Sequence, residues 1–266
     1  MKHCYYALVL LLLAASCQPR LSFPDRANAP ALSKPLEGKL TLSLKPQTNE
    51  RDNDIEGRDF SFGADAAFAP IDHLGIMASY RRLNHKYLSE SKDFFTWSYG
   101  GDYTGSRYEG AIGYFDRLGG KGRWDIYLGY GNGQLERTGW RYPERDYALH
   151  YHRFFLQPSI GMGNDVFLVN GGFRLAWHSY YDFTSPDPDL RYNLLEDNSD
   201  IQSEISGFIE PFINMEVGYK FARVNYQTGW STQLMGSKVG TTLPFYVSMG
   251  LTFHLLPEYF TDNNKR

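Results

Sequence analysis

Two histidines in the middle of the chain have a spacing that could support chemistry. His150 and His152 alternate along one predicted strand, so both imidazoles lie on the same face, where they could hold a metal ion or act as a base. Arg153 lies beside them, and no acidic partner occurs at a fixed spacing. We therefore interpret the pair as polar residues near a strand end.

Other signatures of catalysis or cofactor binding are absent from the sequence. It contains no G-x-S-x-G, no H-E-x-x-H and no P-loop. One acidic stretch could attract calcium, but its spacing fits no EF-hand, so we interpret it as a solvated loop. Its acids are Asp187, Asp189, Glu196, Asp197 and Asp200. We predict no catalytic residue, no metal site and no cofactor, and we do not expect an enzyme.

Ten charged residues form the most suggestive group. With strand periodicity, five acids and five bases fall on one face, predicted to point inward: Asp65, Glu109, Asp125, Glu210 and Glu216 with Arg81, Arg153, Arg174, Lys220 and Arg223. A buried charge is costly unless it is paired, so equal numbers favour a salt-bridge network across an enclosed interior. The alternative is a narrow polar channel, whose selectivity the same residues would set.

The elements that position these charges are ten segments of alternating polarity. In residues 124–131, bulky apolar side chains alternate with Asp, Tyr and Gly. Similar segments lie near 37–45, 60–69, 73–82, 107–116, 150–162, 165–179, 207–220, 222–233 and 245–254. Each is about as long as the roughly 9–11 residues with which a tilted strand crosses a bilayer. Pro158 and Pro211 fall inside two of them, where we expect bulges.

The connections between the segments alternate in length. Short ones lie at 70–72, 118–121, 163–164 and 221, and long polar ones at 46–59, 83–106, 134–149, 180–206 and 234–244. Tight turns at one rim and long loops at the other are typical of outer-membrane barrels. The sequence therefore predicts an all-β fold, a closed antiparallel up-and-down transmembrane β-barrel of about ten strands.

Side-chain size distinguishes this barrel from a soluble one. The polar face is rich in small residues, among them Gly113, Gly129 and Gly250, whereas the apolar face carries most of the Trp, Ile and Leu. The inside of a closed barrel has less room per side chain than the outside. The bulky apolar face therefore points outward into lipid; a soluble sandwich is the alternative.

The first residues of the chain predict export. A basic start and a short apolar run are followed by Ala14, Ala15, Ser16 and Cys17, and the run is too short to span a bilayer. LAASC resembles the lipobox of bacterial lipoproteins, which implies cleavage before Cys17 and acylation of its sulfur. Ordinary cleavage after Ser16, leaving a free thiol, is the alternative. Cys4 leaves with the signal, so Cys17 has no disulfide partner.

These observations divide the chain into four parts. We predict a lipoprotein-type signal peptide at 1–16, an acylated Cys17 with a Pro-rich tether at 17–36, the barrel at 37–256 and a C-terminal tail at 257–266. Strands that start and end at the periplasmic rim match an anchor in the inner leaflet of the outer membrane. A net charge of −3 gives no sign of nucleic-acid binding.

Several segments together resemble a family of known proteins. LAASC, EGKLTLSL, FAPIDHLGIMASY, GRWDIYLGYGNG, FFLQPSIG and FYVSMGLTFHL are similar to small outer-membrane β-barrel proteins of Bacteroidota-like bacteria that carry a lipoprotein signal. Members mostly lack an assigned activity, so the resemblance implies architecture and location only.

The combined expectation is a lipid-anchored outer-membrane barrel with a largely plugged polar lumen. Its role would be structural or would depend on binding by the long loops, because rigid scaffolds usually carry recognition on their loops. Aromatic loop residues would contact a sugar or protein ligand: Trp97, Tyr99, Tyr103, Trp140 and Tyr142. A narrow channel for small solutes and an outer-membrane hydrolase are the second and third alternatives, and no oligomeric state is indicated.

Overall fold

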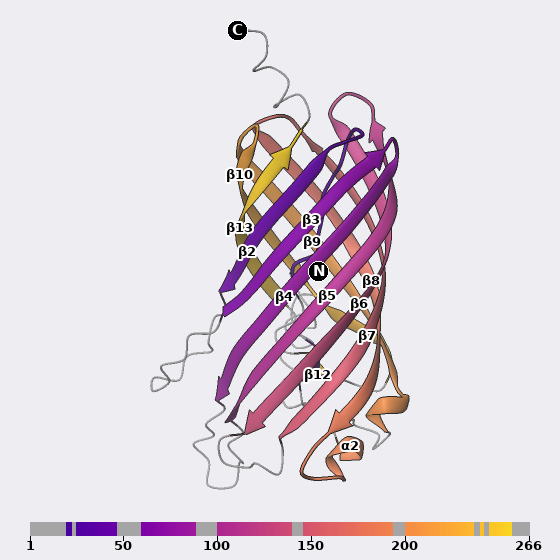
Figure 1. The fold of residues 1–266 in the computed structure, drawn as a ribbon, viewed down its shortest axis with the longest axis vertical. Coiled ribbons are helices and arrows are strands. Elements are labelled where there is room, and N and C mark those ends of the chain that lie inside the picture. Colours follow the sequence, from indigo (N-terminus) through magenta and orange to yellow (C-terminus); the bar gives the residue numbers. More distant parts are fainter. Residues whose placement is uncertain are drawn as a thin grey trace, which may run out of the picture.

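Ten long antiparallel strands form a closed barrel in the computed structural model (Figure 1), which describes residues 20–22, 25–46, 60–88, 100–139, 146–193, 200–236, 240–241 and 245–256. The barrel strands are β2 (Gly38–Pro46), β3 (Phe60–Ile71), β4 (Leu74–Leu88), β5 (Gly100–Leu118), β6 (Gly122–Gly139), β7 (Tyr147–Gly163), β8 (Phe167–Thr184), β9 (Ile205–Tyr219), β10 (Ala222–Trp230) and β13 (Phe245–Leu255). The prediction of the fold class is confirmed.

Each strand pairs with its neighbour in sequence, and the last strand closes the sheet. β13 pairs antiparallel with both β10 and β2, so the first and last barrel strands lie side by side. Thr41 and Thr252 face each other across this seam, with their hydroxyl oxygens 2.9 Å apart. Closure pairs the first and last strands of the sheet with each other, so neither is left as a free edge strand.

In the part of the chain that the structure describes, five short elements accompany the barrel. They are β1 (Arg20–Ser22), α2 (Leu190–Asn193), the 3₁₀ turn η2 (Ile201–Ser203), β11 (Thr232–Met235) and β12 (Gly240–Thr241). β1 pairs in parallel with β12, and β11 pairs with β9 beyond the end of β10. Among the described residues, no helix is long and apolar enough to cross a membrane.

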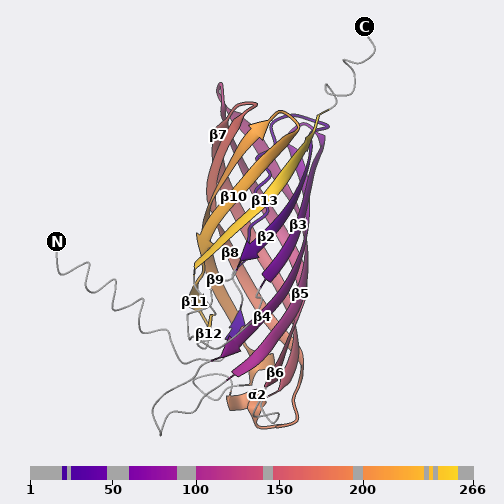
Figure 2. The same cartoon turned by 90° about the vertical axis from the view of Figure 1, so that its left-hand side faces the viewer.

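The predicted contrast in connection length is present around the barrel. One end, the short-turn rim, carries the tight turns after β3, β5, β7 and β9. The opposite end, the long-loop rim, carries the connections after β2, β4, β6, β8 and β10. α2 lies at the long-loop rim, which is the lower end in Figures 1 and 2.

The outer surface is a band of bulky apolar side chains. Ile112 on β5 and Leu128 on β6 are more than half exposed, with Ile160 and Ile213 on other strands. Below this band, towards the long-loop rim, the outward positions become polar. On each of four neighbouring strands, an outward aromatic residue is followed, two positions nearer the long-loop rim, by a polar residue. The pairs are Tyr108 and Ser106, Tyr130 and Asn132, Phe154 and His152, and Trp177 and Ser179. This row of aromatic residues has the character of an interfacial girdle.

The wall is much higher on one side than on the other. β5 to β8, the tall wall, contain 17 to 19 residues each, whereas β10, β13 and β2, the low wall, contain 9 to 11. About 9–11 residues suffice to cross a bilayer. The low wall therefore matches the apolar band, and the tall wall continues past the girdle at the long-loop rim. Figure 2 shows β5 and β6 reaching further towards this rim than β10, β13 and β2.

The expected bulges at the two prolines are not found. The β7–β8 register is unchanged across Pro158: Leu156 pairs with Leu175 and Ser159 with Gly172. Pro211 pairs with Phe173 in an unbroken β8–β9 register and lies opposite the break between β10 and β11. Proline cannot donate a hydrogen bond to a neighbouring strand. At both prolines the pairing with one neighbouring strand is interrupted, and no bulge forms.

Candidate functional site

The lumen is occupied by the chain's own N-terminal segment. Residues 25–36, called the lumen segment below, run inside the barrel, and residues 26–32 are all buried. At the short-turn rim Leu36 N–H donates to the Ala69 carbonyl (2.7 Å), and Ala69 N–H donates to the Glu37 carbonyl (2.9 Å). Residues 25–36 therefore differ from the predicted tether: they have no core of their own, but they form part of the core of the barrel.

Polar side chains of the wall bind the backbone of the lumen segment. Gln227 on β10 accepts from Ala27 N–H (2.7 Å) and donates to the Ala27 carbonyl (3.0 Å). Gln157 on β7 donates to the Asn28 carbonyl (2.6 Å), and Asn170 on β8 donates to that of Ala29 (3.2 Å). An extended segment inside a barrel has no sheet partner, and these side chains satisfy its backbone groups.

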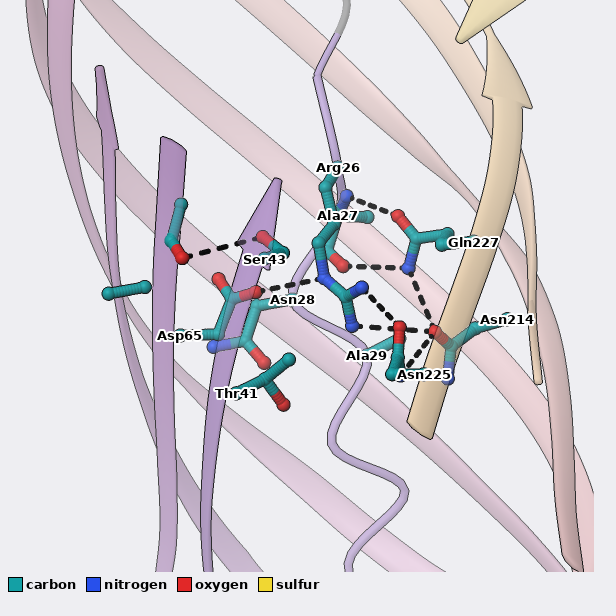
Figure 3. A network of polar contacts seen from close by, with 12 residues as sticks. Arg26, Ala27, Asn28, Ala29, Thr41, Ser43, Asp65, Asn214, Asn225 and Gln227 are labelled. Carbon is teal, nitrogen blue, oxygen red and sulfur yellow. Dashed lines mark hydrogen bonds and ion pairs between the residues drawn. The ribbon is translucent and has the colours of Figure 1, made fainter. Parts of the chain in front are cut away.

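Arg26 is the main charged residue of the lumen segment (Figure 3). Its Nε donates to Asp65 on β3 (3.0 Å), and its terminal nitrogens donate to Asn225 and Asn214 on β10 and β9. Arg81 completes the group by donating to Asp65 (2.6 Å) and to the Arg26 carbonyl (2.9 Å). Arg26 thus joins strands on two sides of the barrel.

A second charged group is centred on Glu109 of β5. Its carboxylate lies 3.0 Å from both Arg107 and Arg174 and 3.1 Å from Arg153. Arg153 also pairs with Glu210 at 2.5 Å. All these side chains are buried, so each carboxylate offsets the desolvation of guanidinium groups that would otherwise be unpaired.

A third group is centred on Glu216 of β9. Lys39 Nζ pairs with it and also donates to the Pro30 carbonyl of the lumen segment (3.0 Å). His254 Nε2 lies 3.0 Å and Arg223 3.8 Å from the same carboxylate. The lumen segment is therefore connected to two of the three charged groups.

The structure places nine of the ten predicted lumen residues inside the barrel. Asp65, Arg81, Glu109, Asp125, Arg153, Arg174, Glu210, Glu216 and Arg223 are buried. Lys220 is the exception, because it is exposed in the tight turn between β9 and β10. Asp125 accepts a hydrogen bond from Ser159 (2.5 Å).

The balance of five acids and five bases is wrong. Nine bases are buried among the described residues: Arg26, Lys39, Lys45, Arg81, Arg107, Arg137, Arg153, Arg174 and Arg223. Six acids accompany them: Glu37, Asp65, Glu109, Asp125, Glu210 and Glu216. Lys39, Lys45, Arg107 and Arg137 could have been found, because each occupies an inward position of its strand alternation. The interior therefore carries an excess of positive charge.

Apolar packing fills the lumen on both sides of the charged groups. Towards the short-turn rim Leu32 is fully buried in a cluster with Phe115, Tyr127 and Phe155. Near the long-loop rim lies the mouth cluster, made of Leu83, Tyr103, Leu135, Tyr147, Leu149, Tyr180 and Ile201. Ile201 belongs to the β8–β9 connection, so part of this loop packs into the barrel mouth. A cavity of about 30 Å³, large enough to hold water, lies near Asp25 and Arg107.

The other predicted residues have several outcomes. Tyr103 is buried in the mouth cluster, so its place in a contact surface is wrong; Trp97, Tyr99, Trp140 and Tyr142 lie outside the described residues, as does Cys17. His150 and His152 point outward beyond the girdle, and His152 stacks on Tyr181 with ring centroids 4.3 Å apart.

The acidic loop is partly described. Asp200 accepts from Gln202 N–H (2.9 Å) and pairs with Arg191, whose hydrogen bond lowers the pKa of Asp200. This is an internal loop contact. Among the residues with described positions, no three His, Cys, Asp or Glu side chains are grouped to hold a metal ion.

Comparisons with known proteins give a fold likeness only. No family model and no curated protein matches the chain. Among solved structures, similar chains are outer-membrane barrels. Ail, the attachment invasion locus protein of Yersinia pestis, has 8% identity and a TM-score of 0.33 over 83% of this chain and 99% of that one. The outer membrane protease OmpT of Escherichia coli has 12% identity and 0.43, over 83% and 94%.

A third similar structure is the β domain of the Bordetella autotransporter BrkA, with 10% identity and a TM-score of 0.39 over 83% of this chain and 99% of that one. At such low identities and scores, none of the activities of these proteins carries over to this chain. The architecture is a closed antiparallel β-barrel, and the resemblance to Bacteroidota-type lipoproteins stays a prediction.

Proposed function

We propose that this protein is an outer-membrane barrel that does not conduct solutes, because its own N-terminal segment closes the lumen, and that it acts through its long-loop rim. The band of exposed apolar residues supports placement in lipid, since an outward surface of this kind is stable there and not in water. The observation that carries the proposal is the complete burial of residues 26–32 inside the wall.

The tall wall supports recognition at the cell surface. β5 to β8 continue past the aromatic girdle, so this wall holds the long-loop rim away from the membrane on a rigid support. A sugar or protein ligand at these loops is part of the proposal. Deletion of residues 89–99 or 140–145 should reduce the binding of the ligand by intact cells; unchanged binding would contradict this part.

Acylation of Cys17 is also part of the proposal, and it would supply the lipid anchor. Two or more acyl chains anchor a protein stably, whereas one is marginal. Cells fed labelled palmitate should label the natural protein and not a Cys17→Ala variant. Label that persists in the variant would show another attachment site.

Single-channel recording in a planar bilayer tests the closed lumen. The natural chain, shown to be folded by a gel shift on boiling, should give no steady unitary current. A variant whose residues 26–32 are replaced by a Gly-Ser segment of equal length should conduct and should favour anions, because bases outnumber acids in the lumen. Steady steps from the natural chain that change with Arg81→Gln would establish the narrow channel instead.

A further inference from the structure

The lumen segment has a fixed direction. Its C-terminal end is held at the short-turn rim, where Leu36 and Glu37 bind Ala69. Its N-terminal end follows β1, whose Arg20 pairs with Gly240 and Ser22 with Thr241 of β12 in the connection between β11 and β13. That connection belongs to the long-loop rim, so the chain passes from this rim to the other through the barrel.

β1 lies beside the low wall. β12 precedes β13, which begins at Phe245, and it follows β10, which ends at Trp230. Both of these aromatic side chains point outward and are about half exposed (55% and 48%), as expected for strand ends at the membrane interface. β1 is therefore bound where the rim is level with the membrane surface, while the tall wall rises on the opposite side.

We propose that the N-terminal end of the exported chain lies at the cell surface, beside the low wall, and that its partner is the outer leaflet of the membrane. The inference rests on the proposed placement of the barrel in the outer membrane. This placement differs from the inner-leaflet anchor that the strand order predicts. That prediction requires residues 17–36 to stay at the periplasmic rim.

Chain length decides between the two leaflets. Cys17 precedes Arg20 by three positions, and three residue steps of fully extended chain reach about 11 Å. The hydrocarbon core that separates the leaflets is about 30 Å thick. Acyl chains on Cys17 are thus within reach of the outer leaflet and out of reach of the inner one. The chain would be anchored at the cell surface by lipid and in the membrane by its wall.

Labelling of introduced cysteines on intact cells tests the direction. Three full-length variants are compared with a maleimide that does not cross the outer membrane: Ser22→Cys, Asp189→Cys in the exposed β8–β9 connection and Lys121→Cys in an exposed tight turn. The labelled peptide is identified by mass spectrometry, so that Cys17 does not interfere. Ser22→Cys should be labelled as Asp189→Cys is, and Lys121→Cys only after the cells are made permeable.

The possible results separate the inference from the function on which it rests. Labelling of Ser22→Cys only in permeable cells, with Asp189→Cys labelled in intact ones, would overturn the inference and leave the barrel placement intact. Equal labelling of Asp189→Cys and Lys121→Cys in intact cells would overturn the placement itself.

Proteolysis provides a second measurement that introduces no cysteine. Trypsin added to intact cells should cut after Arg20 and produce a barrel chain that begins at Leu21, and Arg20→Gln should abolish this product. Appearance of the Leu21 terminus only after the cells are made permeable would contradict the proposed exit.

Discussion

The lumen is closed twice, by two different kinds of packing. Around the lumen segment the closure is polar. Asp65, Glu109 and Glu216 each pair with two or more bases. Side-chain amides of the wall donate to the backbone carbonyls of Ala27, Asn28 and Ala29. At the mouth the closure is apolar, and Ile201 packs into a cluster of aromatic and aliphatic residues. The comparison teaches that the interior of one barrel can be filled by paired charged side chains in one region and by apolar side chains in another.

The two closures should respond differently to small changes. A buried ion pair that loses one partner leaves an unpaired charge, whatever the shape of the new side chain. An apolar cluster depends mainly on volume, and it tolerates substitutions that conserve it. Isosteric substitutions should therefore be severe in the polar closure and mild in the apolar one.

Glu109→Gln should have the largest effect. It keeps the shape of the side chain but removes the charge that Arg107, Arg153 and Arg174 share, so we expect a loss of about 3–5 kcal/mol in the free energy of unfolding. Urea unfolding in lipid vesicles measures it. Glu136→Gln, on the outward face of β6, is the control and should change stability by less than about 0.5 kcal/mol. Equal losses in the free energy of unfolding for the two variants would contradict the special sensitivity of the polar closure to a lost charge.

Ile201→Ala should come next. Ile201 is fully buried, and its truncation should cost about 2–3 kcal/mol, whereas the more conservative Ile201→Val should cost about 1 kcal/mol. Ile205→Ala, at an exposed position nearby, is the matched control. Urea unfolding in lipid vesicles measures these variants as well. If Ile201→Val lowers the free energy of unfolding as much as Glu109→Gln does, the two closures do not differ in their response to small changes.

Gly129→Ala tests how tightly the lumen is packed between the closures. A methyl group at this inward position would lie 2.1 Å from the Phe155 ring, so overpacking should cost about 1–3 kcal/mol. At Gly110, on the outward face, the nearest atom would be 3.9 Å away, and Gly110→Ala should be neutral or slightly stabilising. Similar stabilities of the two variants would indicate a loosely packed interior.

The smallest effect concerns pH and the loop that covers the mouth. The Arg191 hydrogen bond holds the pKa of Asp200 below its ordinary value of 3.8. A lowered pKa means that the contact stabilises the folded loop at neutral pH and that this contribution is lost as the pH falls through the folded pKa. Hydrogen exchange of residues 200–204 should therefore increase only below about pH 4. Arg191→Gln should move the midpoint upward, and an unchanged midpoint would contradict this.

The wall was predictable because its signal is repeated in every strand. Bulky and small side chains alternate with period two over residues 124–131 and in nine further segments, and a barrel in lipid must place them on opposite faces. The alternating lengths of the connections predicted one rim with tight turns and one rim with long loops. The unequal heights of the wall were not predicted, because outward polar residues such as Asn132 and His152 interrupt the apolar alternation that marked the strands.

The interior was only partly predictable. Charges on the strands follow the same alternation, and nine of the ten predicted positions are buried in the barrel. The lumen segment has no periodicity, and its contacts use mainly backbone groups of Ala27, Asn28 and Ala29, which leave no trace in the sequence. The Pro-rich region 17–36, which contains the lumen segment, therefore suggested a tether, and only Arg26 carried a side-chain signal.

The place of the lumen segment in the chain also has a consequence for assembly. The segment precedes β2, and the wall closes around it only when β13 joins β2 at the seam. Because the finished interior is packed, the segment cannot enter once this seam exists. We expect it to bind first to the curved, still open sheet, as a template around which the wall is wrapped, with pairing of Thr41 and Thr252 among the last steps.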